Sequence, residues 1–124
     1  MRNHLASLTH TSHSHIAART ATVTASGVDV SDYSGPLLII QNIGTVSGTN
    51  PTWDGKIEDS ADDSSYASVT GATFTQVTAS NSTQTLLLDT RAVRKYIRYV
   101  GTVGGTSTPT FSVGVTTHGV KNYI

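Results

Sequence analysis

WDGKIEDSADDSSYASVTGATFTQVT, residues 53–78, is the stretch that decides the fold. Its first run places Trp53, Gly55 and Ile57 on one side of an extended chain and polar residues on the other, which is the two-residue period of a half-buried strand. The second run, residues 66–78, is rich in Thr, Val, Phe and Tyr, which fit a pleated sheet. Residues 59–65 between them are Asp, Ser and Ala, and Asp and Ser favour turns. The stretch predicts two strands joined by an acidic loop, with Trp53 in the core.

Further strands are predicted on both sides of this hairpin. The run LLIIQNI, residues 37–43, is apolar at successive positions from Leu37 to Ile40 and again at Ile43, which predicts a central strand covered on both faces. Residues 83–89 and 95–100 predict two more strands, and the alternation from Phe111 to Thr117 predicts a strand with one wet face. The first strand is expected over residues 19–25. The separating segments are rich in turn residues: 26–36, 44–51, 79–82 and 104–109.

Length and composition favour a single all-β domain. The 124 residues suffice for one core and are too few for two ordinary domains. Thr and Ser make up more than a quarter of the chain and only 13% of it is charged, which fits the polar face of a sheet better than a helical surface. The only helical turn expected is one through Arg91–Arg94, capped by Asp89 or Thr90. We therefore predict a β-sandwich of seven or eight short strands, with the jelly roll as one form of it.

The first 18 residues are expected to form an extended N-terminal arm, and residues 19–124 the β-sandwich domain. Residues 1–18 hold few large apolar side chains and show no sustained period. Such a segment buries little surface alone and is expected to order only against a partner. Leu5, Leu8 and Ile16 are then its apolar anchors on a neighbouring subunit.

Charge and cysteine content exclude several classes of protein. The formal net charge is zero, which argues against a general nucleic-acid binder. There is no cysteine, so disulfides and thiolate metal sites are absent. No apolar run is long enough to cross a bilayer. We expect neither a nucleic-acid nor a membrane partner, and a chain that is made and kept in a cytosol or released only when a cell lyses.

Catalytic and metal-binding motifs are not found. There is no nucleophile elbow, no phosphate-binding loop and no HExxH pair. Four of the five histidines fall in the arm, where a polar tail is favoured over a wrapped metal site. The acidic loop offers oxygen ligands to calcium, but its spacing does not match an EF-hand, and a solvated turn is favoured. We predict no catalytic residue, no cofactor and no metal site.

The strongest charge feature is the basic cluster of Arg91, Arg94, Lys95 and Arg98. Asp residues elsewhere balance it, so the cluster reads as half of a bipolar surface that associates with other copies or with an acidic partner. A few solvated charges around a sandwich are the alternative. Together with Tyr96 and the arm anchors, Arg91, Arg94 and Arg98 are the predicted interface residues.

The aromatic residues Trp53, Tyr66, Tyr96 and Tyr99 allow a second reading of the surface. Exposed on one face, they would form a platform that stacks on sugar rings. Trp53 shares a face with Ile57, which favours the core for Trp53. For the tyrosines, packing and sugar binding both stay open.

Three segments resemble small structural proteins encoded in the head-gene region of tailed bacteriophages. They are GVDVSDYSGPL (residues 27–37), KIEDSADDSSY (56–66) and YIRYVGTVGGT (96–106). The resemblance covers most of residues 27–115 and leaves the arm outside. Similar segments also recur in carbohydrate-binding sandwiches, so the motifs are only moderately specific.

The resemblance implies a virion protein without enzymatic activity. Its members are often decoration or cement proteins that sit on the capsid exterior as β-rich oligomers. It thus implies a capsid decoration protein that binds the major capsid protein, as a homo-oligomer with a trimer favoured. A head–tail connector or a tail component is the alternative within the virion, and a carbohydrate-binding module or host-surface adhesin is the alternative outside it.

Overall fold

A computed structural model describes the backbone of residues 8–121 and shows an all-β fold, as predicted. The strands join into one antiparallel sheet, and the only helical element in this range is the 3-10 turn η2, Thr90–Ala92. No helix in the described range is long and apolar enough to span a bilayer. The strands are β1 (Leu8–Arg19), β2 (Val23–Thr24), β3 (Val28–Asp29), β4 (Tyr33–Ser60), β5 (Ala67–Thr73), β6 (Ser82–Asp89) and β7 (Tyr96–Lys121).

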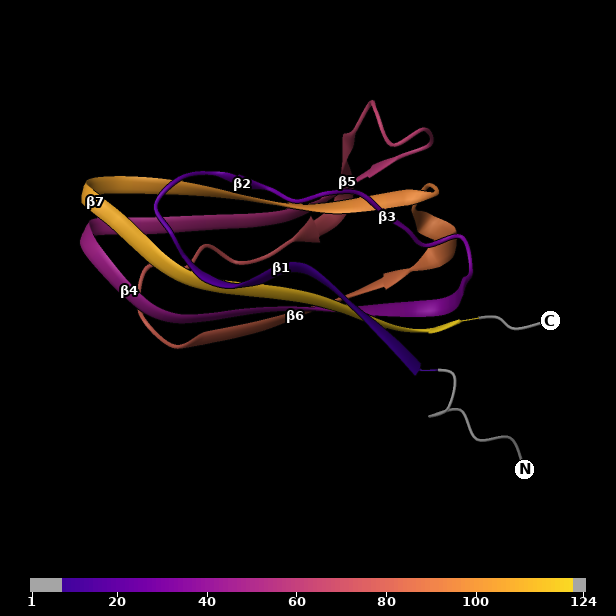
Figure 1. The fold of residues 1–124 in the computed structure, drawn as a ribbon, viewed down its shortest axis with the longest axis horizontal. Helices are drawn as coiled ribbons and strands as arrows, with labels where there is room; N and C mark the ends of the chain where they lie inside the picture. The colour runs from indigo at the N-terminus through magenta and orange to yellow at the C-terminus, as the bar shows by residue number, and fades with distance from the viewer. Residues whose placement is uncertain (1–7, 122–124) are drawn as a thin grey trace.

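The sheet folds over on itself because β4 and β7 are far longer than ordinary strands and each turns a corner (Figure 1). The first half of β4 pairs with the second half of β7, as at Ile39↔Thr117, and their other halves pair at Ile57↔Tyr99. Two layers result, β1–β7–β4–β6 and β2/β3–β7–β4–β5, here called the β6 layer and the β5 layer. This arrangement is the jelly roll form of the predicted sandwich.

The two corners are segments predicted as loops between short strands. Residues 44–51 and 104–109 do carry turn geometry, with left-handed φ values of 108° at Gly48 and 114° at Gly105. The ladder also shifts register several times between Ile43 and Thr52. Yet β4 and β7 stay paired through the corners, as at Ser47↔Thr110. The expectation of separate short strands is wrong here, because the turn residues bend both strands together without ending either.

Strand β1 corrects the predicted boundary after residue 18. Residues 8–18 belong to the sheet, and β1 pairs with β7 from Leu8↔Val120 to Arg19↔Phe111. This segment consists largely of Ser, His, Thr and Ala, so it pairs through its backbone and offers little apolar surface. The register shifts on both sides of Ser14 also interrupt the two-residue period of a strand. The strand expected at residues 19–25 is reduced to the end of β1 and the short β2. Residues 1–7 lie outside the described residues.

The predicted hairpin is confirmed in its first strand, where Trp53, Gly55 and Ile57 are buried and Asp54 is exposed. Its second strand, β5, is shorter than expected and ends at Thr73. The capped turn is also confirmed, because the Asp89 carboxylate accepts a hydrogen bond from the Arg91 backbone N–H at the start of η2. The alternation from Phe111 to Thr117 is confirmed as well, with both ends of that run buried.

The strand through Leu37 and Ile43 is covered on one face only, which corrects its prediction. Leu37, Ile39 and Ile43 are at most 1% exposed, whereas Leu38 is 37% exposed. These buried residues belong to the β6 layer, and the inner side of that layer packs against the β5 layer. The continuous apolar run therefore places large side chains on an outer face as well as in the core.

A chain of buried hydrogen bonds joins the two layers through the core. The Trp53 indole N–H donates to the Tyr99 hydroxyl at 2.7 Å, and that hydroxyl donates to Gln41 Oε1 at 2.5 Å. Burial raises the pKa of Tyr99, so the hydroxyl keeps its proton. Two glycines make room: a Cβ on Gly55 would lie 2.1 Å from Gln41 Oε1, and one on Gly101 would lie 2.3 Å from the Trp53 ring.

His13 fixes β1 to its neighbour from the inside of the sheet. Its Nε2 atom is hydrogen-bonded to the Thr117 hydroxyl on β7, and the side chain is 9% exposed. Nδ1 is buried and has no hydrogen-bond partner among the described residues. Burial alone lowers the pKa of His13 to about 4, so the ring is neutral at pH 7.

Removing the Tyr99 hydroxyl tests the inter-layer hydrogen bonds. We expect Tyr99→Phe to lower the free energy of unfolding by about 1–3 kcal/mol, because the buried Trp53 N–H and Gln41 oxygen each lose a partner. Tyr96→Phe, at a half-buried ring, is the control and should cost less than about 0.5 kcal/mol. Equal costs in urea unfolding would show that the hydrogen bonds contribute nothing beyond packing.

Lowering the pH tests His13. Since its pKa is about 4 when folded and 6.5 when unfolded, its contribution is fully present above pH 6.5 and is lost as the pH falls toward 4. We expect a loss of roughly 1.4 kcal/mol per pH unit in that window. His13→Gln keeps a hydrogen-bonding group for Thr117 and should remove this slope, whereas His10→Gln on the exposed side of β1 should retain it. The same slope in all three proteins would exclude His13 as its cause.

Candidate functional site

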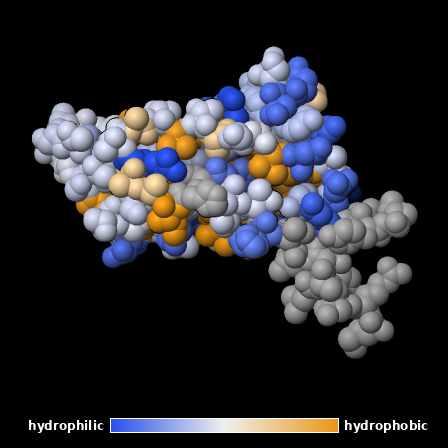
Figure 2. Space-filling model, viewed as in Figure 1, coloured by the Kyte–Doolittle hydropathy of each residue, from blue (hydrophilic) through white to orange (hydrophobic). Residues whose placement is uncertain are grey.

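The outer faces of the two layers are the candidate functional surfaces, and they differ in charge. Among the residues whose side chains the structure describes, no three His, Asp or Glu come together as ligands for a metal. Hydrophilic residues gather over the loop that follows β4, at the upper right of Figure 2. That end of the molecule carries the acidic loop and most of the basic cluster.

Glu58 lies on the outer face of the β5 layer, near the end of β4. It forms ion pairs with Arg98 at 2.7 Å and with Lys56 at 3.3 Å. Burial alone would raise the pKa of Glu58, but the hydrogen bonds from Arg98 and Lys56 outweigh it and lower that pKa. The Arg98 guanidinium also lies 3.9 Å from the centroid of the Tyr66 ring. Arg98 is therefore held by contacts within its own chain.

The other members of the basic cluster also have acidic partners in the same chain. Arg94 is bound at three points to Asp59: its guanidinium donates to the carboxylate at 2.9 Å and to the backbone carbonyl at 2.8 Å, and its backbone N–H donates to the carboxylate at 3.0 Å. Arg91 pairs with Asp89 at 2.9 Å, and Lys95 lies 3.9 Å from Asp29. The Arg91 hydrogen bonds lower the pKa of Asp89. The opposite charges predicted from the sequence thus meet inside one molecule.

The predicted interface residues lie in separate parts of the fold. Ile16 is 72% exposed on β1, and the Arg91 side chain is 89% exposed beside η2. Tyr96 is half-buried at the start of β7, with the Lys95 ammonium 5.3 Å from its ring centroid. Leu8 begins β1, opposite Val120. Leu5 lies outside the described residues.

The acidic loop is organised by its own hydrogen bonds. The Asp62 carboxylate accepts from the backbone N–H groups of Ser64 and Ser65, both at 3.0 Å, and from the Ser60 hydroxyl at 2.9 Å. The two backbone N–H groups, of Ser65 first, are the largest causes that lower the pKa of Asp62 to about 2. Asp63 accepts a hydrogen bond from the Tyr66 hydroxyl. The carboxylates that would serve calcium therefore already stabilise a turn.

The tyrosines do not share an exposed platform. Tyr99 is fully buried in the core with Trp53. Burial and the Asp63 carboxylate raise the pKa of Tyr66 to about 12, and Arg98 stacks on its ring. Of the three tyrosines considered for sugar binding, two are thus engaged in packing or ion-pair contacts.

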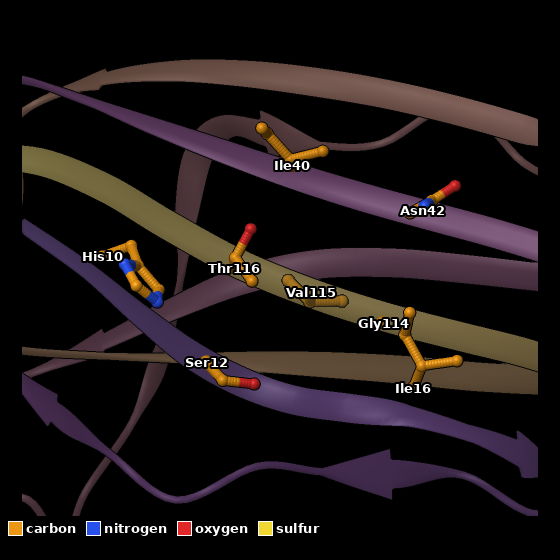
Figure 3. A pocket seen from close by; sticks show the side chains of 8 residues that line it. All are labelled: His10, Ser12, Ile16, Ile40, Asn42, Gly114, Val115 and Thr116. Atoms are coloured by element: carbon orange, nitrogen blue, oxygen red, sulfur yellow. The ribbon is translucent and has the colours of Figure 1, made fainter.

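The outer face of the β6 layer has a different character. A hollow of about 610 Å³ lies between β1 and β4, over β7 (Figure 3). Gly114 and Thr116 of β7 form its floor, and Ile16 and Ile40 stand on opposite sides. His10, Ser12 and Asn42 add polar groups. The His10 and His118 rings stack beside it with centroids 5.9 Å apart.

Sequence reasoning missed most of this face. Ile16 was identified, but Leu38 and Ile40 were assigned to a strand buried on both sides. Leu87 was read only as the centre of a strand, although it is 70% exposed. Successive side chains of a strand alternate between its two faces, and this alternation could have located the exposed face. Leu37, Ile39, Gln41 and Ile43 share one face, so Leu38 and Ile40 share the other.

Comparison with known proteins shows the fold alone. No family model matches the chain, and no curated protein sequence matches it. A chain from the solved structure titled "Structure of infectious bursal disease virus Gx strain" matches 94% of this chain with a TM-score of 0.59 and 11% sequence identity. The match covers 33% of that chain, so the present chain spans about a third of the length of the viral one. The jelly roll described here is thus also found in a chain of a virus structure.

Proposed function

We propose that this chain is a structural protein of a virus particle and has no enzymatic activity. The observation that carries the proposal is the likeness in fold, over 94% of the chain, to a chain from a solved virus structure. Jelly rolls occur in viral capsid domains and in lectins, so the fold alone leaves both classes open. The charged and aromatic residues support the first class, because most of those that the structure describes are engaged in contacts within the chain.

Within the virion, we propose a capsid decoration protein on the outside of a tailed-phage head. Its partner would be the major capsid protein, and several copies would bridge neighbouring subunits. Support comes from the resemblance of residues 27–37, 56–66 and 96–106 to proteins of the phage head-gene region. A rigid, self-neutralised domain suits this role, because an oligomer with several modest contacts gains from high effective concentration. A head–tail connector or tail component would use the same surfaces at another position.

Reconstitution tests this function. Particles of the virus that encodes the chain, prepared without it, are mixed with the purified protein and pelleted. We expect saturable binding at a fixed number of copies per particle and a higher temperature of genome release. Absence of binding to particles, together with glycan-specific binding on an array, would contradict the proposal and favour the carbohydrate-binding alternative.

Charge reversal separates contact with the particle from stability of the chain. Arg91 is almost free of packing and forms an ion pair with Asp89 at the surface, so Arg91→Glu should leave the free energy of unfolding nearly unchanged. If Arg91 contacts the particle, Arg91→Glu should weaken binding, and higher salt should weaken binding of the wild type. Thr20→Glu, in the exposed bend after β1, is the matched control.

Arg94 should behave differently. Arg94→Ala leaves the buried Asp59 carboxylate without its cation, so we expect a loss of about 1–3 kcal/mol in the free energy of unfolding. Weaker particle binding by this variant would therefore not identify Arg94 as a contact. A stability equal to that of wild type would show that the pair is replaced by solvent at no cost.

A further inference from the structure

The exposed large hydrophobic residues of the described chain all lie on one surface. They are Ile16 at 72%, Leu38 at 37% and Leu87 at 70% exposure. Leu38 pairs with Leu87 across β4 and β6, and Ile16 covers Gly114 of β7 from β1. All three stand on the outer face of the β6 layer, and Ile16 lines the hollow of Figure 3. Exposed apolar side chains gathered in this way mark an interaction site more strongly than scattered ones.

This face also lacks charge in its central rows. The rows His10–His118–Leu38–Leu87 and Ser12–Thr116–Ile40–Thr85 follow the strand pairing and contain no Asp, Glu, Lys or Arg. The ion pair of Asp89 and Arg91 lies at one end, outside these rows. The outer face of the β5 layer carries Lys56, Glu58 and Arg98 instead. A charged partner on the β6 layer would thus bury charges without counter-charges, which is costly.

The size of the face suits a folded partner. Its four strands, about 4.8 Å apart and about ten residues long, span roughly 650 Å². A standard interface buries about 800 Å² on each partner, so the face is close to the required area. Its polar residues, Ser12, Asn42, Thr116 and the histidines, donate and accept hydrogen bonds, so a copy of the same face is a compatible partner.

We propose that two copies of this chain pair through the outer faces of their β6 layers. A contact between this face and another part of a second copy would set its hydrophobic residues against the polar, ion-paired surfaces described above. An isologous contact, in which the same face serves both copies, instead sets apolar against apolar. The inference deepens the proposed function by giving the contact between copies, and it rests on that function only for the role of the pair in a particle. A two-fold pair differs from the trimer favoured by the resemblance.

The strand rows give the pair a register. A two-fold axis lying in the interface along β4 sets β6 of each copy over β7 of the other. Leu87 then lies over His118 of the other copy, because Leu87, Leu38 and His118 share one row, and Leu38 lies close to the axis. The hollow, between Ile16 and Ile40, flanks this contact. The same contact occurs twice by symmetry.

Sedimentation of the isolated full-length chain tests the pairing without any particle. We expect a reversible monomer–dimer equilibrium, with a dissociation constant raised at least tenfold by Leu87→Asp, which replaces an apolar contact of the interface by a charge. Thr102→Asp, at an exposed position of the β5 layer, should leave the equilibrium unchanged. Circular dichroism and melting temperature should be alike in all three proteins, since both positions point to solvent.

Cross-linking tests the register. The chain has no cysteine, so Leu38→Cys and Thr102→Cys each introduce a single thiol. A short bis-maleimide should link two Leu38→Cys chains in high yield and leave Thr102→Cys chains unlinked. A wild type that stays monomeric, a trimer, or a dimer indifferent to Leu87→Asp would overturn the proposal. If the chain is monomeric and Leu87→Asp abolishes binding to particles, the face binds a different virion protein; the pairing then fails while the proposed function stands.

Discussion

The hydrogen-bond chain from Trp53 through Tyr99 to Gln41 is the constraint on which the rest of the fold depends. It joins the β5 layer to the β6 layer inside an otherwise apolar core, where an unpaired polar group is costly. A register slip in either β4 or β7 would move one of these groups away from its partners. Gly55 and Gly101 belong to the same constraint, because any side chain there would collide with the Trp53 ring or the Gln41 amide. These hydrogen bonds thus specify which positions of the two long strands, β4 and β7, face each other.

Much of the fold is readable from the sequence where period and burial coincide. The alternation at Trp53 and at Phe111, and the Asp89 cap, were predicted correctly because side chains of one face share one environment there. Strand β1 was not predicted, because its pairing depends on backbone hydrogen bonds and on His13, and neither of these produces a hydrophobic pattern in the sequence. The corners of β4 and β7 were read as strand ends, because Gly and Pro signal a bend and do not tell whether pairing continues through it.

The candidate surfaces show a similar division. The basic cluster is visible in the sequence, but only the three-dimensional structure shows that Glu58, Asp59 and Asp89 pair with it within the chain. The exposed face of the β6 layer was not predicted, because an unbroken apolar run is also typical of a strand that is buried on both faces. The contrast between the two outer faces therefore arises from strand order, which sets Leu38 beside Leu87 and Glu58 beside Arg98.

The continuous pairing of β4 with β7 has a consequence for how the chain folds. The two strands are antiparallel, so their closest positions in sequence are Ser60 and Tyr96, and their most distant are Tyr33 and Lys121. Closing the shorter loop costs less conformational entropy, and the Arg94–Asp59 contact lies at that end. We expect the ladder to start there and to extend round the corners toward Lys121, with β1 adding last because its partner segment forms last. Dominance of such long-range contacts places the chain among slow-folding β proteins, with refolding on a millisecond-to-second scale.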